Sequence, residues 1–269
     1  MKYDDFSTRM KEYESNTTQT KLIPLLPVIA RLDGHGFSKW TKGLSRPYDE
    51  RLSKLMIETT KHLHTKYNAT ISYTQSDEIT LVWYIDNYKT KMEFSGKLFK
   101  LTSLLAATAS VFFNKKIGEY LPEKINTLPE FDCRVWNVPN LIEVANCLLW
   151  REQDATKNSI SMAASHYYSH NFLLNKSGKE KQELLHQKGI NWNDYPNFFK
   201  KGTYIQKRRI SRKFNTIELN KLPENHEAHQ NPDLEIERWE IKELDIPMLS
   251  KISNKVDVLL FNKNVILYE

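Results

Sequence analysis

The sequence has little cysteine and no long apolar segment, and both absences narrow its possible class. Cys133 and Cys147 are the only two cysteines in 269 residues, which gives neither zinc-site spacing nor a disulfide framework. No segment approaches the ~18 to 20 apolar residues that cross a bilayer, since polar side chains interrupt the best candidate, residues 98–113. Residues 1–14 carry acids without an apolar core, unlike a signal or transit peptide. We therefore expect a cytoplasmic protein without a membrane partner.

Three common enzyme motifs are also missing. The sequence contains no phosphate-binding P-loop, no HExxH zinc motif and no glycine-rich dinucleotide fingerprint. It shows no internal repeat and no low-complexity linker either. No such motif therefore competes with the acidic residues described below.

Charge is unevenly distributed along the chain. The net charge of +6 is the sum over a basic and an acidic segment that lie close together in the sequence. Residues 200–213 contain seven Lys and Arg and no acid, whereas residues 218–245 contain nine acids against three basic residues. A basic stretch of this density fits a polyanionic partner, because contacts to phosphates release counterions. A solvated strand that pairs with its acidic neighbour explains the pattern equally well. Both interpretations stay open at this point.

Hydrophobic patterning predicts an α+β core in the first half of the chain. Strands are indicated by short β-branched runs at residues 27–33, 69–75, 79–84 and 131–139. Helices are indicated by one-sided apolar spacing, from an N-cap at about Asp49 and over residues 97–114. This order is that of a split βαβ, or ferredoxin-like, unit. We therefore expect a palm-type antiparallel sheet with helices on one face.

The second half of the chain is predicted to add helices and a basic hairpin to this core. Helices are expected at residues 141–174 and 179–188, a strand at 202–209, an exposed loop at 223–232 and a hairpin at 256–268. We divide the chain into a palm catalytic core, residues 1–139, and an extension, residues 140–269, within one continuous domain.

Two aspartates fall at one edge of this sheet. Asp33 ends the first strand and Asp77 lies at the hairpin tip, and these strands are neighbours in a split βαβ unit. Adjacent carboxylates repel unless a cation offsets them, and hard oxygen ligands near phosphate favour Mg²⁺. Two such ions would serve an in-line displacement, with Asp33, Asp77 and the neighbouring Glu78 as catalytic residues. A palm polymerase or a nucleotide cyclase has a site of this type.

Five short motifs extend this interpretation to a family. They read RLDGHGF at 31–37, RPYD at 46–49, QSDE at 75–78, WREQD at 150–154 and KKGT at 200–203. In this order, over about residues 5 to 210, they resemble the motifs of the tRNA-His guanylyltransferase family and its guanylyltransferase-like relatives. The resemblance implies a reverse-direction polymerase that activates the 5′ end of a tRNA. The 3′-hydroxyl of an incoming nucleotide then attacks the activated 5′ phosphate.

The resemblance also implies partners and site residues. It implies two Mg²⁺ ions as cofactors, GTP and ATP as substrates, and tRNA as partner. It also implies a homo-oligomer, since members of the family tend to form tetramers. Metal ligands would be Asp33, the Gly34 carbonyl and Asp77. The nucleotide pocket would be formed by Asp33, Gly34, His35, Gly36, Phe37, Ser38, Arg46, Ser76, Asp77 and Lys97. The Phe37 ring would pack on a base, although a lone aromatic residue after a strand belongs to the core as often. tRNA would contact Arg151, Asp154, Asn158, Lys200, Lys201, Lys207, Arg208, Arg209 and Arg212, so the extension contributes to tRNA binding.

One departure from the family pattern bears on the substrate. Members that act on tRNA-His carry a His-x-Asn-Asn-like block after the tryptophan–arginine element, where this chain has Thr156 and keeps only Asn158. The departure favours the guanylyltransferase-like branch, which repairs 5′-truncated tRNA by copying the opposite strand. Addition of an unpaired guanosine to tRNA-His is the alternative. A catalytically inactive palm that binds RNA is a further one.

Overall fold

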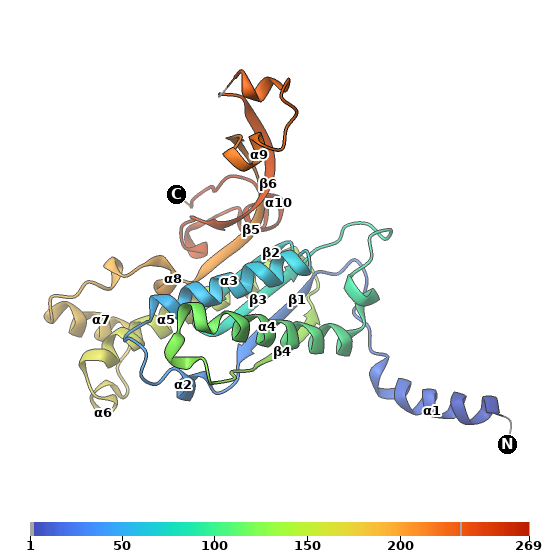
Figure 1. The fold of residues 1–269 in the computed structure, drawn as a ribbon. Coiled ribbons are helices and arrows are strands. Elements are labelled where there is room, and N and C mark those ends of the chain that lie inside the picture. The colour runs from blue at the N-terminus through green and yellow to red at the C-terminus, as the bar shows by residue number, and fades with distance from the viewer. Residues whose placement is uncertain (1–2, 232, 269) are drawn as a thin grey trace.

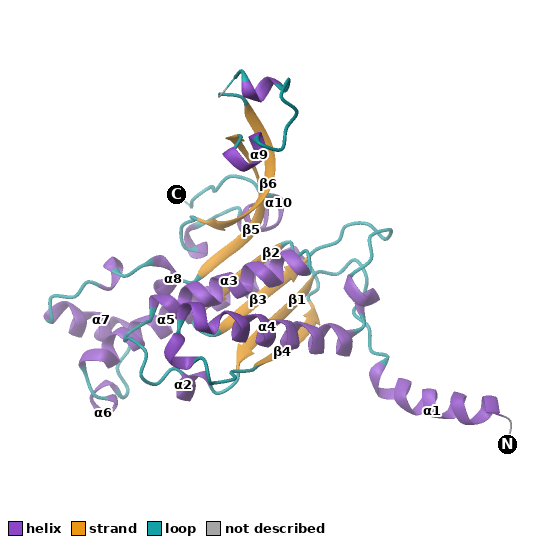
Figure 2. Cartoon of the chain, in the orientation of Figure 1, coloured by secondary structure: helices purple, strands orange, loops and turns teal. Residues whose placement is uncertain are grey.

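A six-stranded antiparallel sheet organises the computed structural model, which describes residues 3–231 and 233–268. The strands follow the order β4-β1-β3-β2-β5-β6 across the sheet (Figure 2). The first four are ordered as in a split βαβ unit, which confirms the predicted α+β palm-type fold. The strand bounds are β1 (Val28–Gly34), β2 (Ile71–Gln75), β3 (Glu78–Trp83), β4 (Phe131–Asn137), β5 (Thr203–Lys213) and β6 (Glu235–Leu244).

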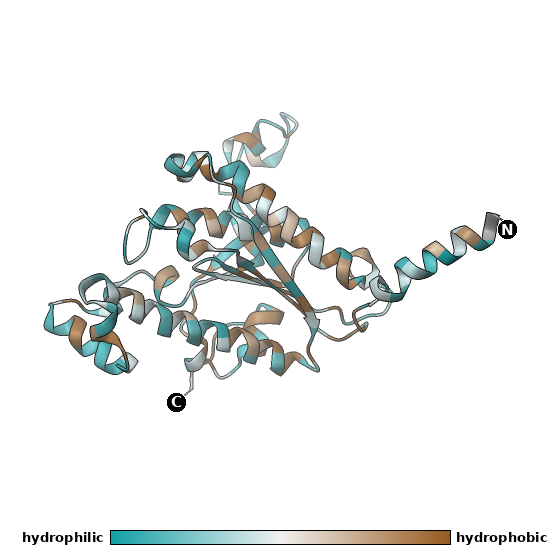
Figure 3. Ribbon diagram, turned by 90° about the horizontal axis from the view of Figure 1, so that it is seen from below, coloured by the Kyte–Doolittle hydropathy of each residue, from teal (hydrophilic) through white to brown (hydrophobic). Residues whose placement is uncertain are grey.

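Helices cover both faces of the sheet (Figure 3). The palm helices α3 (Glu50–Lys66) and α4 (Leu98–Tyr120) pack on one face, as predicted. On the other face lie α5 (Leu141–Tyr167) and α10 (Lys255–Phe261), both from the second half of the chain. Strand β1 shows why two layers are needed. Ala30 packs with the first pair of helices, whereas its neighbour Ile29 packs with the second pair, so β1 is apolar on both sides.

Two parts project from this body (Figure 1). Helix α1 (Tyr3–Thr18) extends away beside the start of β1, and the long β5–β6 ribbon rises from the far edge of the sheet. The remaining helices are short. They are α2 (Phe37–Trp40), α6 (His170–Leu173), α7 (Gly178–Gln187), α8 (Asn197–Lys200) and α9 (Thr216–Leu219), with 3-10 turns at Glu93–Gly96, Pro122–Lys124, Trp192–Asp194, Glu227–His229 and Leu249–Lys251.

The predicted hairpin at residues 256–268 is wrong, because its first half is helix α10. Val258, Leu259 and Leu260 are all buried, which a helix in contact with α5 achieves and an alternating strand would not. Asn262 ends the helix in the left-handed conformation, with φ 59°. Asn262 therefore caps a helix at the place where the predicted hairpin would need its turn.

Strand β5 pairs with β2, so residues beyond 139 complete the sheet that the palm begins. This pairing supports our proposal that both halves form one continuous domain. Strand β6 and helix α1 were not predicted from the sequence. None of the helices within residues 3–231 and 233–268 combines the length and apolarity that a bilayer crossing requires.

Candidate active site

The end of β1 and the tip of the β2–β3 hairpin meet at one edge of the sheet. Asp33 stands opposite Glu78 in the β1–β3 ladder, and the Gly34 N–H donates to the Asp77 carbonyl oxygen at 3.0 Å. Ser76 turns the hairpin in the left-handed conformation, with φ 49°. Strand order alone thus brings Asp33 and Asp77 together, as the sequence predicted. We call this part of the sheet the catalytic edge.

A cavity of about 940 Å³ opens over the catalytic edge. Its floor comes from β1 and the hairpin tip, one rim from the loop before α3, and its far wall from one side of α5. It is lined by Arg31, Asp33, Arg46, Pro47, Gln75, Ser76, Asp77, Glu78, Trp150, Arg151, Asp154, Asn158, Ser161, Met162, Ser165 and His166.

The two aspartates form a like-charge pair. Burial raises the pKa of Asp77, and the charge of nearby Asp33 raises it further, against hydrogen bonds from its own backbone and from Ser76. No group of three or more His, Cys, Asp or Glu that could hold a metal occurs in the described part of the chain. Two carboxylates with a backbone carbonyl nonetheless suit Mg²⁺, which keeps several waters and takes further oxygens from substrate phosphates. The residues present therefore fit a phosphate-bound Mg²⁺ site.

Glu78 and Arg151 form a buried ion pair beneath the aspartates. Arg151 Nε and Nη2 donate to the two Glu78 carboxylate oxygens at 2.7 and 2.9 Å, and Nη2 also donates to Asp154 at 2.8 Å. Burial raises the pKa of Glu78, and the Arg151 charge opposes that rise. Both carboxylate oxygens of Glu78 and two nitrogens of Arg151 are thus engaged within the chain. Both residues also line the cavity, so the catalytic role expected of Glu78 and the tRNA contact expected of Arg151 stay predictions.

In the turn after β1, backbone groups rather than side chains are available for contact with a ligand. A Cβ on Gly34 would lie 2.4 Å from the Phe37 ring, and Gly36 has φ 68°, so both positions need glycine. Phe37 is 2% exposed and packs on Trp40, Phe113 and Phe131. The expected base contact of its ring is therefore corrected to a core role. His35 and Ser38 are exposed beside it, outside the cavity lining.

Arg46 reaches the cavity from the loop before α3. Asp49 caps this helix by accepting the Arg51 N–H at 3.0 Å, and it also accepts the Ser45 N–H at 3.2 Å. The Arg51 side chain lowers the pKa of Asp49 to about 2, although burial opposes this. One ionised carboxylate thus fixes the loop that carries Arg46, which is consistent with a nucleotide role for this arginine.

Lys97 does not belong to this site. It precedes α4 and forms an isolated bridge with Lys21, at the end of the sheet where β1 begins. The part of α4 near the cavity is Phe113, which contacts Phe37. Sixteen helical residues rise by about 24 Å, so a nucleotide at the catalytic edge is out of reach of Lys97.

The lysines of the KKGT motif are turned inward. Lys201 is buried and its Nζ donates to the Ile246 carbonyl, while Lys200 Nζ donates to the Asn193 carbonyl. Neither residue lines the cavity. The Lys201 bond joins the start of β5 to the segment before α10, whereas the Lys200 bond is local. The tRNA contacts expected of these two lysines stay predictions.

The basic strand β5 pairs with the acidic segment, which is β6. Arg209 forms an ion pair with Glu237, and Arg212 pairs with Glu218 and Glu240 at 2.7 Å each. The half-buried Arg208 donates to the Val258 carbonyl at 3.2 Å. Of the two interpretations of the charge pattern, these contacts favour the internal one. The tRNA contacts expected of these three arginines stay a prediction, as does that of Lys207, which is exposed.

Several cavity residues were missed in the sequence. The wall of α5 continues past the predicted Asp154 and Asn158 to residues 161–166, and Trp150 stands beside Arg151. These positions recur every three or four residues, which is the spacing of one helix face. Extending that periodicity from Arg151 would have found the wall. Arg31 could have been found from its place two residues before Asp33, on the same face of β1.

Comparison with known proteins identifies the family of the chain. A family model described as tRNAHis guanylyltransferase matches residues 7–139. The tRNA(His) guanylyltransferase of Saccharomyces cerevisiae is 30% identical over 210 residues, which are 71% of this chain and 86% of that protein.

Solved structures extend the likeness over nearly the whole chain. A bacterial tRNA(His) guanylyltransferase-like protein in complex with ATP has a TM-score of 0.75 and 34% identity, covering 95% of this chain and 98% of that one. Its complex with GTP has a TM-score of 0.71 and 34% identity, covering 92% and 95%. The chain therefore belongs to the tRNA-His guanylyltransferase family, and it is a nucleotidyltransferase.

Proposed function

We propose that this enzyme adds nucleotides in the 3′–5′ direction to the 5′ end of tRNA in the cytoplasm, as a template-dependent repair of truncated molecules. The observation that carries the proposal is the pairing of Asp33 and Asp77 at the floor of a large cavity. At about 940 Å³ the cavity lies at the upper end of ordinary ligand sites, so it has room for a nucleotide beside an RNA end.

Two Mg²⁺ ions would be held by Asp33, Asp77 and the Gly34 carbonyl. When bound, they would activate the attacking oxygen and stabilise the leaving oxygen of an in-line displacement. The substrates would be GTP and ATP, the nucleotides bound by the related bacterial protein. Arg46 and the half-buried Arg31 line the same cavity and would offset triphosphate charge.

The reaction would then be a phosphoryl transfer at the RNA end. The 3′-hydroxyl of the incoming nucleotide attacks the 5′ phosphorus of the tRNA, which carries a triphosphate or an adenylyl group. A new P–O bond forms as pyrophosphate or AMP leaves, and the hydroxyl proton passes to solvent. The residues of the chain would orient both substrates for this transfer.

The α5 wall supports template-dependent selection. Where tRNA-His enzymes carry histidine and paired asparagines, this helix carries Thr156, Lys157, Asn158, Ser159 and Ser161. Ser159 is buried and bonds to the carbonyls of Thr156 and Lys200, so it is unavailable to RNA. The remaining short hydroxyls contact backbone better than they read base edges. Pairing with the opposite strand would therefore supply the selectivity.

Addition of a single guanosine to tRNA-His is the second candidate, favoured by the activity of the yeast relative. The test incubates the enzyme with full-length tRNA-His and with 5′-truncated tRNAs of several identities, each with labelled nucleotides. We expect similar extension of every truncated tRNA, with the added nucleotide set by the opposing base. Preferential addition of one unpaired guanosine to tRNA-His would instead establish the second candidate.

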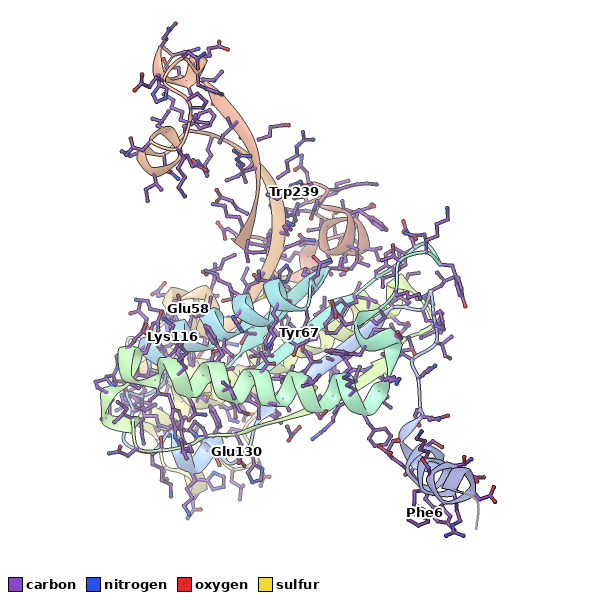
Figure 4. All side chains as sticks on the ribbon, turned by 45° about the vertical axis from the view of Figure 1, so that its right-hand side comes forward. Phe6, Glu58, Tyr67, Lys116, Glu130 and Trp239 are labelled. Atoms are coloured by element: carbon purple, nitrogen blue, oxygen red, sulfur yellow. The ribbon has the colours of Figure 1, made fainter. Side chains whose placement is uncertain are left out.

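We also propose that the enzyme self-associates, as the resemblance implies, with a tetramer as the expected form. The projecting helix α1 carries Phe6, Met10 and Tyr13 at the spacing of one helix stripe, and all three are exposed. Figure 4 labels Phe6 on this helix. Sedimentation of the chain at several concentrations tests this, and a monomer throughout would refute it.

A further inference from the structure

Trp150 is an exposed aromatic residue in the wall of the catalytic cavity. It keeps 54% of its surface exposed, whereas the next two residues of α5, Arg151 and Glu152, are buried. The cavity around it is otherwise lined mainly by charged and polar side chains. Exposure alone does not distinguish this ring, but its place in the lining of the cavity does, because a flat apolar group bound there can contact it.

The ring is held in place by cations. The Arg151 guanidinium carbon lies 4.3 Å from the ring centroid, and that of Arg31 lies 6.0 Å away. Both distances allow cation–π attraction. Arg151 is itself fixed by its two bonds to Glu78 at 2.7 and 2.9 Å. The indole therefore has a defined position rather than the freedom of a surface side chain.

This chain of contacts ties the ring to the reacting centre. Glu78 follows Asp77 in sequence and stands opposite Asp33 in the ladder. A shift of either aspartate relative to α5 would thus strain the ion pair beneath it. A ligand with phosphates at the catalytic edge and a planar ring on Trp150 would therefore have both groups held at a fixed distance and orientation.

We propose that Trp150 is a stacking platform for a nucleobase whose phosphates lie at the Asp33–Asp77 edge. Stacking is available to every base, because each has a π face, and so it holds a base without choosing it. That property suits a site in which a template makes the choice, and to this extent the inference rests on the proposed function. The base belongs either to the incoming nucleotide or to the 5′-terminal residue of the RNA.

The test compares Trp150→Ala and Trp150→Phe with Trp239→Ala. Trp239 is a matched control, since it is 57% exposed but lies on the β5–β6 ribbon away from the cavity (Figure 4). Equilibrium binding is measured for GTP, for 5′-truncated tRNA and for inorganic tripolyphosphate, which has no base. Trp150→Ala should weaken binding of GTP, of tRNA or of both by roughly 5- to 100-fold, the size of one lost base stack. Trp150→Phe should restore most of it.

Tripolyphosphate distinguishes stacking from a structural role. Its binding should stay unchanged in all three variants, since it offers nothing to stack. A loss confined to GTP assigns the base to the incoming nucleotide, and a loss confined to tRNA assigns it to the RNA end. Unchanged binding of both ligands, or an equal loss for tripolyphosphate, overturns the proposal.

Binding does not require turnover, so this result is independent of the repair assay. Base-dependent affinity without nucleotide addition to any tRNA would refute the proposed function and leave the platform intact. Addition to tRNA with no effect of Trp150→Ala would do the reverse.

Discussion

Charge is concentrated in two regions of the molecule, the catalytic edge and the β5–β6 ribbon, and they accommodate it in opposite ways. On the ribbon, Arg209, Arg212 and Lys213 each face a carboxylate of the same chain. At the edge, Asp33 and Asp77 face each other, and burial together with the Asp33 charge raises the pKa of Asp77. Like charges held together are costly unless something else compensates them. A high density of charge therefore does not by itself identify a site. The two regions differ in whether charges of opposite sign within the chain offset one another, as they do on the ribbon and do not between Asp33 and Asp77.

Helix α5 links the two regions through consecutive residues. Arg151 turns toward the catalytic edge and pairs with Glu78, whereas Glu152 turns toward the base of the ribbon. Glu152 accepts the Leu249 N–H at 2.7 Å and the Tyr204 hydroxyl at 3.2 Å. The same helix therefore carries two buried charges, Arg151 offset by an ion pair and Glu152 offset only in part by hydrogen bonds. Each of them gives a test of how the two regions accommodate charge.

The largest expected effect comes from removing charge at the catalytic edge. Asp33→Asn and Asp77→Asn keep the side-chain size, and each should lower turnover by at least ~10²- to 10³-fold, the scale of one lost transition-state stabiliser. Melting temperatures should be equal to or above that of the unmodified enzyme, because a repulsive pair is relieved. Single-turnover nucleotide addition and thermal melts measure both quantities. Asp86→Asn, exposed in the loop after β3, is the control. Normal turnover of either edge variant would remove the proposed Mg²⁺ ligands.

Breaking the buried pair should have its main effect on stability. Arg151→Met leaves Glu78 buried without a partner, which should lower the free energy of unfolding by about 3 to 5 kcal/mol. Arg209→Met removes an exposed pair and should cost less than about 1 kcal/mol. Urea unfolding compares the two variants, and Arg151→Met with Glu78→Gln should recover part of the loss. Unchanged stability with weaker nucleotide binding would instead support the phosphate role that the sequence suggested for Arg151.

The next effect is a dependence of stability on pH through Glu152. Burial raises the pKa of this carboxyl to about 7, despite the Leu249 N–H, Lys201 and Tyr204, which favour the charged form. Between its ordinary value near 4.5 and about 7, the folded state therefore binds more protons than the unfolded state. The free energy of unfolding should fall as pH rises through that window. Glu152→Gln should flatten the fall and be more stable than the unmodified chain above pH ~7. Urea unfolding from pH 5 to 8 tests this. If the free energy of unfolding falls with pH at the same slope in both proteins, a group other than Glu152 takes up the proton.

The sequence predicts what depends on strand order and local capping. The meeting of Asp33 and Asp77 follows from the order of the palm strands, and Asp49 was identified as a helix cap from its neighbours. Contacts between distant segments could not be predicted: nothing near Glu78 in the sequence indicates that its partner lies 73 positions away, on α5. The hairpin predicted at the segment of α10 is wrong for another reason. A short apolar run fits a buried helix and a buried strand alike, and packing on α5 decides between them.

The smallest effect is expected on the ribbon, where it decides between the two interpretations of the basic strand. If Arg209 and Arg212 are already neutralised by their carboxylates, Arg209→Gln with Arg212→Gln should leave the salt dependence of tRNA binding unchanged. Lys207 is exposed and forms no ion pair within the described residues, so it is the matched test of a free cation.

Lys207→Gln should lower the slope of log affinity against log salt by roughly 0.7 to 0.9 if that lysine meets a phosphate. Binding measured from low to moderate salt gives all three slopes. A drop of about 1.4 to 1.8 in the arginine double variant would mean that tRNA opens the ion pairs and takes both arginines. In that case the ribbon would be a tRNA-binding surface, and its internal ion pairs would form only while tRNA is not bound.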